Sequence, residues 1–189
     1  MATITEAALM PLYSEVRAEM SKTKRIALCG VLTALALALS LAERMIPLEL
    51  LIPVPGIKLG LANVVTMFAL LFLTPKEAFS ILFCRVILAS LFAGSITAFA
   101  FSLSGGTLAL TITWLLLPKR GTWFSMYGIS AAAAAMHNCG QVAAAVFIMQ
   151  SWNVIAYLPL LLVASIPMGL LTGGIITVLD RHMKHMRLV

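Results

Sequence analysis

Charged residues are scarce in this chain: they make up 11% of its 189 positions, whereas 61% of the positions are hydrophobic. Soluble domains carry about 25% charged residues, so this composition excludes a soluble globular protein and predicts an all-α protein embedded in a lipid bilayer. Lysine and arginine outnumber the acidic residues by 13 to 7. In a soluble protein such an excess would indicate a nucleic-acid partner. In a membrane protein the positions of these cations indicate instead which loops face the cytoplasm. We expect no nucleic-acid partner.

Acidic residues are scarcer still, and their absence limits the chemistry. Asp180 is the single aspartate, and we place all the glutamates in tails or loops: Glu6, Glu15, Glu19, Glu43, Glu49 and Glu77. Prenyl diphosphate chemistry needs carboxylate-held magnesium, which one aspartate at the end of a span does not provide. An intramembrane proton relay would need acidic residues inside spans. The chain also lacks the glycine-rich phosphate loop of ATPases. We therefore expect no enzyme activity, no catalytic residue, no metal and no cofactor.

The apolar runs predict a six-helix transmembrane bundle. We expect spans at residues 26–42, 57–73, 78–94, 97–117, 125–149 and 155–179. Each is close to the roughly 20 residues that cross a bilayer. Together they form a membrane domain over residues 22–182, between a cytoplasmic extension at 1–21 and a basic tail at 183–189. The pair Gly105-Gly106 falls inside the fourth span and predicts a loosened or broken helix there.

The distribution of cations predicts the orientation. With the N-terminus inside the cell, ten of the thirteen cations fall on the inner side: Arg17, Lys22, Lys24, Arg25, Lys76, Lys119, Arg120, Arg181, Lys184 and Arg187. Arg44 and Lys58 fall outside, and Arg85 lies within the third span. This asymmetry predicts that both termini are cytoplasmic and that residues 43–58 are outside.

A group of polar residues interrupts the fifth span and is the strongest candidate for a binding site. His137 and Gln141 are four residues apart on one helix face, and Asn138 lies three residues from Gln141. Because unpaired polar groups are costly in hydrocarbon, this face must meet other helices, water or a ligand. Polar contacts between helices are one interpretation, and a small-molecule site is the other.

Three further polar positions, with Ser102, complete the candidate substrate site. Arg85 lies close to the middle of the membrane and needs a partner: a backbone carbonyl, a neutral side chain or an anionic ligand. Asn63 either caps a helix or binds the ligand, and Lys58 either extends outward to water or contributes to the site. Neutral hydrogen-bonding groups with added positive charge predict a neutral or anionic small molecule.

Small residues recur at four-residue spacing in the first span, at Gly30, Ala34 and Ala38. Similar rows occur in the fifth span, at Gly128, Ala132, Gly140 and Ala144, and in the sixth span, at Gly169 and Gly173. Such rows allow helix backbones to approach closely. For the fifth and sixth spans we favour packing within the chain, and for the first span an external partner.

Several motifs resemble one family. They are Pro55–Asn63 (PGIKLGLAN), Arg85, Ser102–Gly106 (SLSGG) and His137–Gln141 (HNCGQ), in this order. Over about residues 22–182 the chain resembles the Gx transporter family, often labelled heptaprenyl diphosphate synthase component I. That family in turn is similar to the substrate-binding S components of energy-coupling factor (ECF) importers.

The resemblance implies a multi-pass protein of the bacterial cytoplasmic membrane, with a substrate pocket near the outer face. It implies that Gly30, Ala34 and Ala38 dock an ECF-type transmembrane coupling subunit that carries two ATPase subunits. The segment 43–58 would then be a lid over the pocket. The alternative function is that of a non-catalytic membrane partner in an isoprenoid-quinone synthesis or redox complex.

Overall fold

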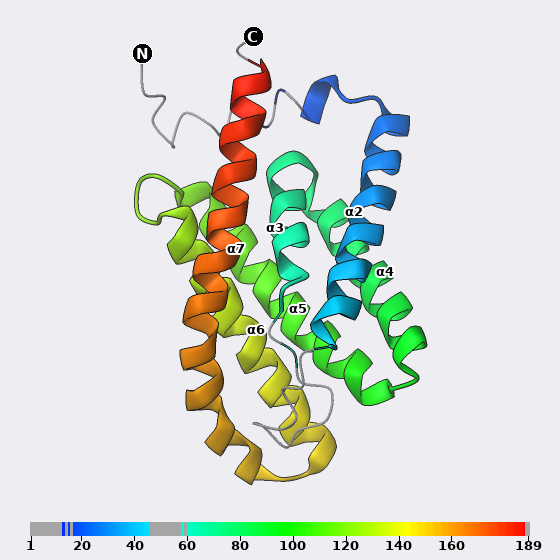
Figure 1. Ribbon diagram of the computed structural model, residues 1–189, viewed down its shortest axis with the longest axis vertical. Coiled ribbons are helices and arrows are strands. Elements are labelled where there is room, and N and C mark those ends of the chain that lie inside the picture. Colours follow the sequence, from blue (N-terminus) through cyan, green and yellow to red (C-terminus); the bar gives the residue numbers. More distant parts are fainter. Residues whose placement is uncertain (1–12, 14, 16, 46–57, 59, 188–189) are drawn as a thin grey trace.

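The computed structural model describes residues 13, 15, 17–45, 58 and 60–187. These residues form helices joined by short turns, and they contain no β-sheet. The helices are α2 (Lys22–Glu43), α3 (Asn63–Phe72), α4 (Pro75–Ala93), α5 (Ile96–Leu116), α6 (Met126–Met149) and α7 (Leu158–Arg187), with the short 3₁₀ turns η3 (Leu117–Lys119) and η4 (Trp152–Tyr157). Consecutive helices run in opposite directions, so the protein is an antiparallel helix bundle (Figure 1).

Four helical segments are long and apolar enough to cross a membrane: Lys22–Glu43, Ile96–Lys119, Met126–Met149 and Trp152–Met183. The predicted all-helical membrane protein is therefore confirmed. Side-chain caps begin three of these helices, close to the predicted starts of the spans. Ser21, Ser95 and Ser125 each accept a hydrogen bond from a backbone N–H in the first turn of the helix that follows. Such caps satisfy amide groups that have no partner within the helix.

The second predicted span is only partly helical in the described residues. Residue 57, where we expected it to begin, lies outside them, and α3 begins only at Asn63. Its ten residues are about 15 Å long, roughly half the hydrocarbon thickness. The preceding backbone is held at Gly60 with φ +90°, a conformation that favours glycine and is incompatible with a continuing helix. The N-terminus of α3 therefore lies inside the bundle.

The predicted break at Gly105-Gly106 is wrong, because α5 is continuous through both glycines. Instead, Gly105 packs closely against α6, and Gly106 packs against Leu82 of α4. A Cβ on Gly105 would lie 2.7 Å from the carbonyl oxygen of His137, and a Cβ on Gly140 would lie 2.7 Å from that of Ser104. The Ser104 hydroxyl also donates to the Gly140 carbonyl oxygen at 2.6 Å. The glycines thus bring α5 and α6 into backbone contact.

The glycine row of α7 packs in the same way. A Cβ on Gly173 would lie 2.9 Å from the Cα of Tyr127, and Gly169 packs even more tightly on the backbone of Ala131. Both contacts join α7 to α6, which confirms that this row packs within the chain.

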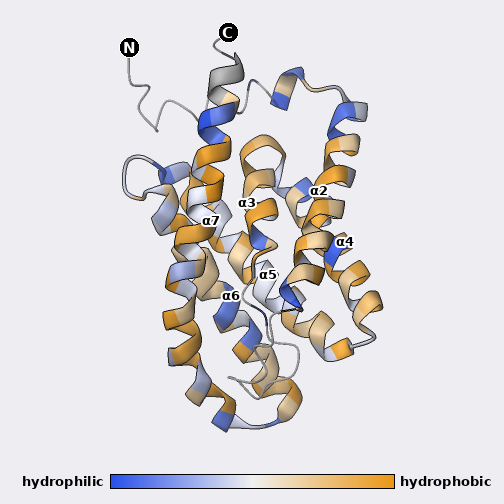
Figure 2. Ribbon diagram, in the orientation of Figure 1, coloured by the Kyte–Doolittle hydropathy of each residue, from blue (hydrophilic) through white to orange (hydrophobic). Residues whose placement is uncertain are grey.

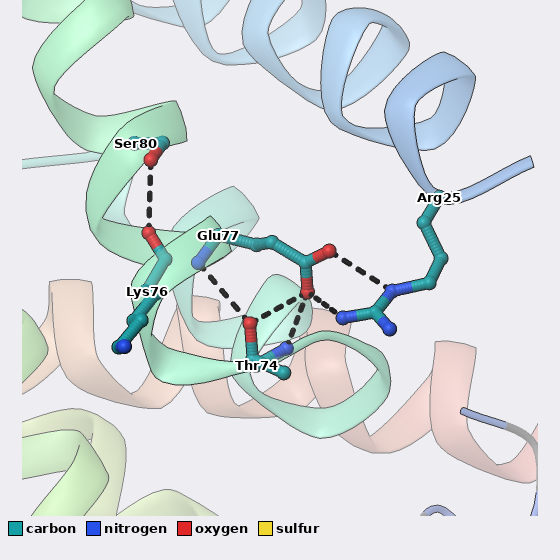
Figure 3. A network of polar contacts seen from close by, with 5 residues as sticks. All are labelled: Arg25, Thr74, Lys76, Glu77 and Ser80. Atoms are coloured by element: carbon teal, nitrogen blue, oxygen red, sulfur yellow. Dashed lines mark hydrogen bonds and ion pairs between the residues drawn. The ribbon is translucent and has the colours of Figure 1, made fainter. Parts of the chain in front are cut away.

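One end of the bundle is rich in cations. The start of α2, the start of α4, the turn after α5 and the last turns of α7 all lie there (Figure 1). We call it the basic end. Arg25 on α2 donates to both carboxylate oxygens of Glu77 on α4, at 2.9 and 2.8 Å, and Thr74 also donates to Glu77 (Figure 3). The hydrogen bonds from Arg25 are the main cause that lowers the pKa of Glu77 to about 2.

A second ion pair lies at the basic end and joins α7 to the turn that follows α5. Arg120 Nη2 donates to Asp180 Oδ2 at 2.6 Å, and both side chains are buried. The hydroxyl group of Tyr13 donates to the other carboxylate oxygen. The single aspartate of the chain is therefore engaged in holding α7 to the turn that follows α5.

Candidate functional site

Polar side chains from α2 to α6 gather around the short segment that precedes α3. Hydrophilic positions appear on α2, α3, α4 and α6 within an otherwise hydrophobic bundle (Figure 2). Arg85 lies about 15 Å along α4 from its start, and His137 about 16 Å along α6. Both helices start at the basic end, so the two residues share one depth near the middle of the bundle.

Gln141 binds the backbone of this segment at Lys58. Its Nε2 donates to the carbonyl oxygen of Lys58 at 2.9 Å, and the Lys58 N–H donates to its Oε1 at 2.9 Å. Non-helical backbone at membrane depth requires such partners, because lipid provides none. His137 Nε2 contacts Gln141 Nε2, so the predicted shared face of these residues is confirmed.

The side chain of Lys58 points into the bundle. Its Nζ donates to Ser102 Oγ of α5 at 3.1 Å, so it does not extend outward to water. The sequence left both alternatives open for Lys58. The structure brings Lys58, Ser102, His137 and Gln141 together, and their role in binding a substrate stays a prediction.

Arg85 is 5% exposed. Its partners are two neutral side chains, which is one of the three kinds of partner that we considered for it. Its Nη1 donates to Ser40 Oγ at 3.1 Å, and its Nη2 donates to Asn63 Oδ1 at 2.9 Å. Because arginine only donates, the amide oxygen of Asn63 must face it. The Asn63 Nδ2 group then points toward Gly60 and has no hydrogen-bond partner among the described residues.

Glu43 belongs to the polar cluster, although the sequence did not lead us to include it. We placed it in an outer loop, but it is the last residue of α2 and is only 2% exposed. Its Oε1 accepts hydrogen bonds from the backbone N–H groups of Gly60 and Leu61, the latter at 3.3 Å. A signal was present: Ser40 and Glu43 are three residues apart and share the inner face of an apolar helix. Residues 46–57 of the predicted lid lie outside the described residues.

Asn138 points in a different direction from the other candidate residues. Its Nδ2 donates to the carbonyl oxygen of Leu161 on α7 at 2.8 Å. Its Oδ1 has no hydrogen-bond partner among the described residues. Asn138 therefore makes a polar contact between helices, which was one of our two interpretations. His137 and Gln141 instead face the segment before α3.

A cavity of about 10 Å³ lies beside this cluster, between α3, α6 and α7. It is lined by Gly60, Asn63, Val64, Met67, Ser130, Ala133, Ala134, Met168 and Thr172. Its volume is about that of one water molecule. Among the described residues, no three His, Cys, Asp or Glu side chains come together as metal ligands would.

The predicted docking residues lie on the outward face of α2. Gly30, Ala34 and Ala38 are exposed, and a Cβ on Gly30 would meet nothing within 4 Å. The opposite face carries the buried residues of α2, which are Leu32, Ala36, Ser40 and Glu43. The small-residue row of α2 is therefore not used for packing within the described part of the chain. Docking of a partner on it stays a prediction.

The chain is similar to one described protein family. A profile of heptaprenyl diphosphate synthase component I matches residues 32–179, which is well over half of the chain. No curated protein and no solved structure matches the chain.

Proposed function

Because the chain belongs to the heptaprenyl diphosphate synthase component I family, we propose that it is the membrane-embedded substrate-binding subunit of an ECF-type small-molecule importer. Partner ATPases drive the import, and the chain itself is not an enzyme. It is a multi-pass protein of the cell membrane, with six spans and both termini in the cytoplasm. The observation that carries the proposal is the polar cluster at mid-bundle depth around Lys58, Arg85 and Gln141.

The composition of this cluster favours binding over catalysis. It offers amide, hydroxyl, imidazole and cationic groups, which hydrogen-bond a neutral or anionic small molecule. Glu43 is its single carboxylate among the described residues, and its Oε1 is bound to backbone N–H groups. Asp180 is held by Arg120 at the basic end. Catalysis on a diphosphate would need several carboxylates around a magnesium ion instead.

The outward face of α2 supports a partner-driven importer. Gly30, Ala34 and Ala38 present a row without bulky side chains, and such rows allow a second helix to approach closely. We assign this face to the transmembrane coupling subunit, which carries two ATPase subunits. The chain needs this partner because it has no phosphate-binding loop of its own.

The family description favours a second candidate function. A protein named as one component of a synthase can be the membrane partner of an enzyme without contributing catalytic residues. On this alternative, the outward face of α2 would bind a subunit of an isoprenoid-quinone synthesis or redox complex.

Affinity purification of the chain from its own membranes tests the proposal. We expect the purified complex to contain a transmembrane subunit, two ATPase subunits and a bound small molecule that mass spectrometry identifies. Ala34→Trp and Ala38→Trp should abolish this assembly, whereas Leu35→Trp, which replaces an already large exposed residue, is the matched control. Recovery of a prenyl-transferring or redox enzyme in place of ATPases would refute the importer and support the alternative.

A further inference from the structure

A carboxylate group already occupies an anion site at the centre of the bundle. The N–H groups of Gly60 and Leu61 are consecutive in the chain and both donate to Glu43 Oε1. Gly60 has φ +90°, which turns the two N–H groups toward one point. Consecutive N–H groups arranged in this way form a concave anion-binding nest.

The surroundings of the nest attract negative charge. Lys58 lies two residues before Gly60, and Arg85 donates to Ser40, which is three residues before Glu43 on α2. The N-terminus of α3, which carries a partial positive charge, begins three residues after Gly60. Glu43 itself is the last residue of α2, and a negative charge at the C-terminal end of a helix is unfavourable. At this position its Oε1 is held by the two N–H groups of the nest.

The cluster also holds hydrogen-bonding groups that its own side chains leave unused. Arg85 is 5% exposed, and its Nε has no hydrogen-bond partner among the described residues. The Asn63 Nδ2 group, beside Gly60, is also without one. Both are donors, so an added group with acceptor oxygens would satisfy them.

We propose that the nest of Gly60 and Leu61, with Lys58 and Arg85, is the subsite for a carboxylate group of the substrate. Glu43 is then an internal substitute that the substrate displaces. This inference rests on the proposed function, because it names the substrate class of the same site. Exchange of one carboxylate for another leaves the local charge unchanged, which matters because uncompensated charge is costly in a buried site. A diphosphate would add further negative charge, and a cation would meet Lys58 and Arg85.

The test is chemical rescue of the isolated chain by small carboxylates. Glu43→Ala empties the nest, and formate or acetate should then fill it. We would measure the Tm of the detergent-solubilised protein while sodium formate or acetate replaces sodium chloride at constant ionic strength. Glu77→Ala is the matched control, because it removes a carboxylate that is also paired with an arginine but lies at the basic end.

We expect a lower Tm for Glu43→Ala in chloride, and a saturable rise in formate or acetate. The small size of formate limits its Kd to about 1 mM or weaker. The parent protein and Glu77→Ala should not respond, and adding Lys58→Met to Glu43→Ala should reduce the response. If Glu43→Ala does not fold, Glu43→Gln keeps the shape but leaves only a neutral amide oxygen in the nest. Formate should displace this weaker acceptor, so the Tm of Glu43→Gln should also rise saturably.

A flat response in both Glu43 variants, or an equal response in Glu77→Ala, would overturn the anion site. This outcome leaves the importer untouched, because it does not involve the partner subunits. Conversely, rescue by formate in a chain that purifies without ATPase subunits would retain the anion site and reject the importer.

Discussion

Replacement of Gly60 by alanine should be among the most damaging single changes in the chain. The backbone at Gly60 has φ +90°, and an L-residue in a left-handed conformation costs about 1–2 kcal/mol. The new Cβ would also lie 2.8 Å from Asn63 Nδ2 and 2.9 Å from His137 Cδ2. Forcing an extra carbon into a packed interior costs about 1–3 kcal/mol. Together the two effects predict a loss of about 2–5 kcal/mol in the free energy of unfolding.

Neither neighbour of the new Cβ can move away without a further loss. Asn63 is held through its Oδ1 by Arg85, and His137 contacts Gln141. Movement of Asn63 would deprive the buried Arg85 of one of its two hydrogen-bond partners. We therefore expect Gly60→Ala to disturb other hydrogen bonds of the polar cluster. The loss in the free energy of unfolding should then lie near the upper end of the range given above.

Gly30→Ala is the matched control, because a Cβ at this position meets nothing within 4 Å. Gly30 lies inside α2, where alanine is favoured over glycine by up to about 1 kcal/mol. The free energy of unfolding of both variants can be measured by denaturant titration in mixed detergent micelles, followed by circular dichroism. Equal stability of Gly60→Ala and the parent, or an equal loss in Gly30→Ala, would refute the reasoning from φ and close contact.

Three further outcomes are expected. Gln141→Ala leaves the Lys58 backbone unpaired and should cost about 1–3 kcal/mol of stability, whereas Asn138→Ala removes one contact between helices and should cost about 0.6 kcal/mol; similar losses in the same titration would contradict this difference. Reporter fusions after residue 122 should be cytoplasmic and those after residue 151 external, and the reverse pattern would invert the topology. The pKa of Glu77 is lowered from 4.5 to about 2, so its contribution to stability is complete above pH 4.5 and is lost as the pH falls toward 2. The difference in Tm between the parent and Glu77→Gln should therefore be constant from pH 7 to about pH 5 and should shrink below that, and a pH-independent difference would contradict the ion pair with Arg25.

The sequence alone determined the features that depend on short stretches of chain. A long run of apolar residues favours a membrane helix through its own composition, and α6 at Met126–Met149 agrees with the predicted span at 125–149. The i, i+4 spacing of His137 and Gln141 likewise predicts their contact, because helix geometry alone places them on one face. The gathering of cations at one end of the bundle follows from the order of the spans.

Predictions from local sequence were wrong at two glycine positions, Gly105-Gly106 and Gly60. The pair Gly105-Gly106 has the same sequence whether a helix breaks there or packs closely there. The closeness of α6 to Gly105 and of α4 to Gly106 decides for packing. At Gly60 the opposite holds, because the backbone leaves the helical conformation before α3. The apolar run at 57–73, which includes Gly60, was predicted to be one span, but the helix in its described residues is only Asn63–Phe72.

The tertiary structure alone decided which buried polar groups meet. Gln141 and Lys58 are 83 positions apart, and Ser102 and Lys58 are 44 positions apart. Glu43 ends one helix and binds backbone that leads into the next, although its sequence position indicated an outer loop. Burial makes a hydrogen-bond partner necessary for each such group, but it does not specify the partner. The partner is whichever group the packing of the helices brings within reach, and that packing depends on contacts between residues far apart in the chain.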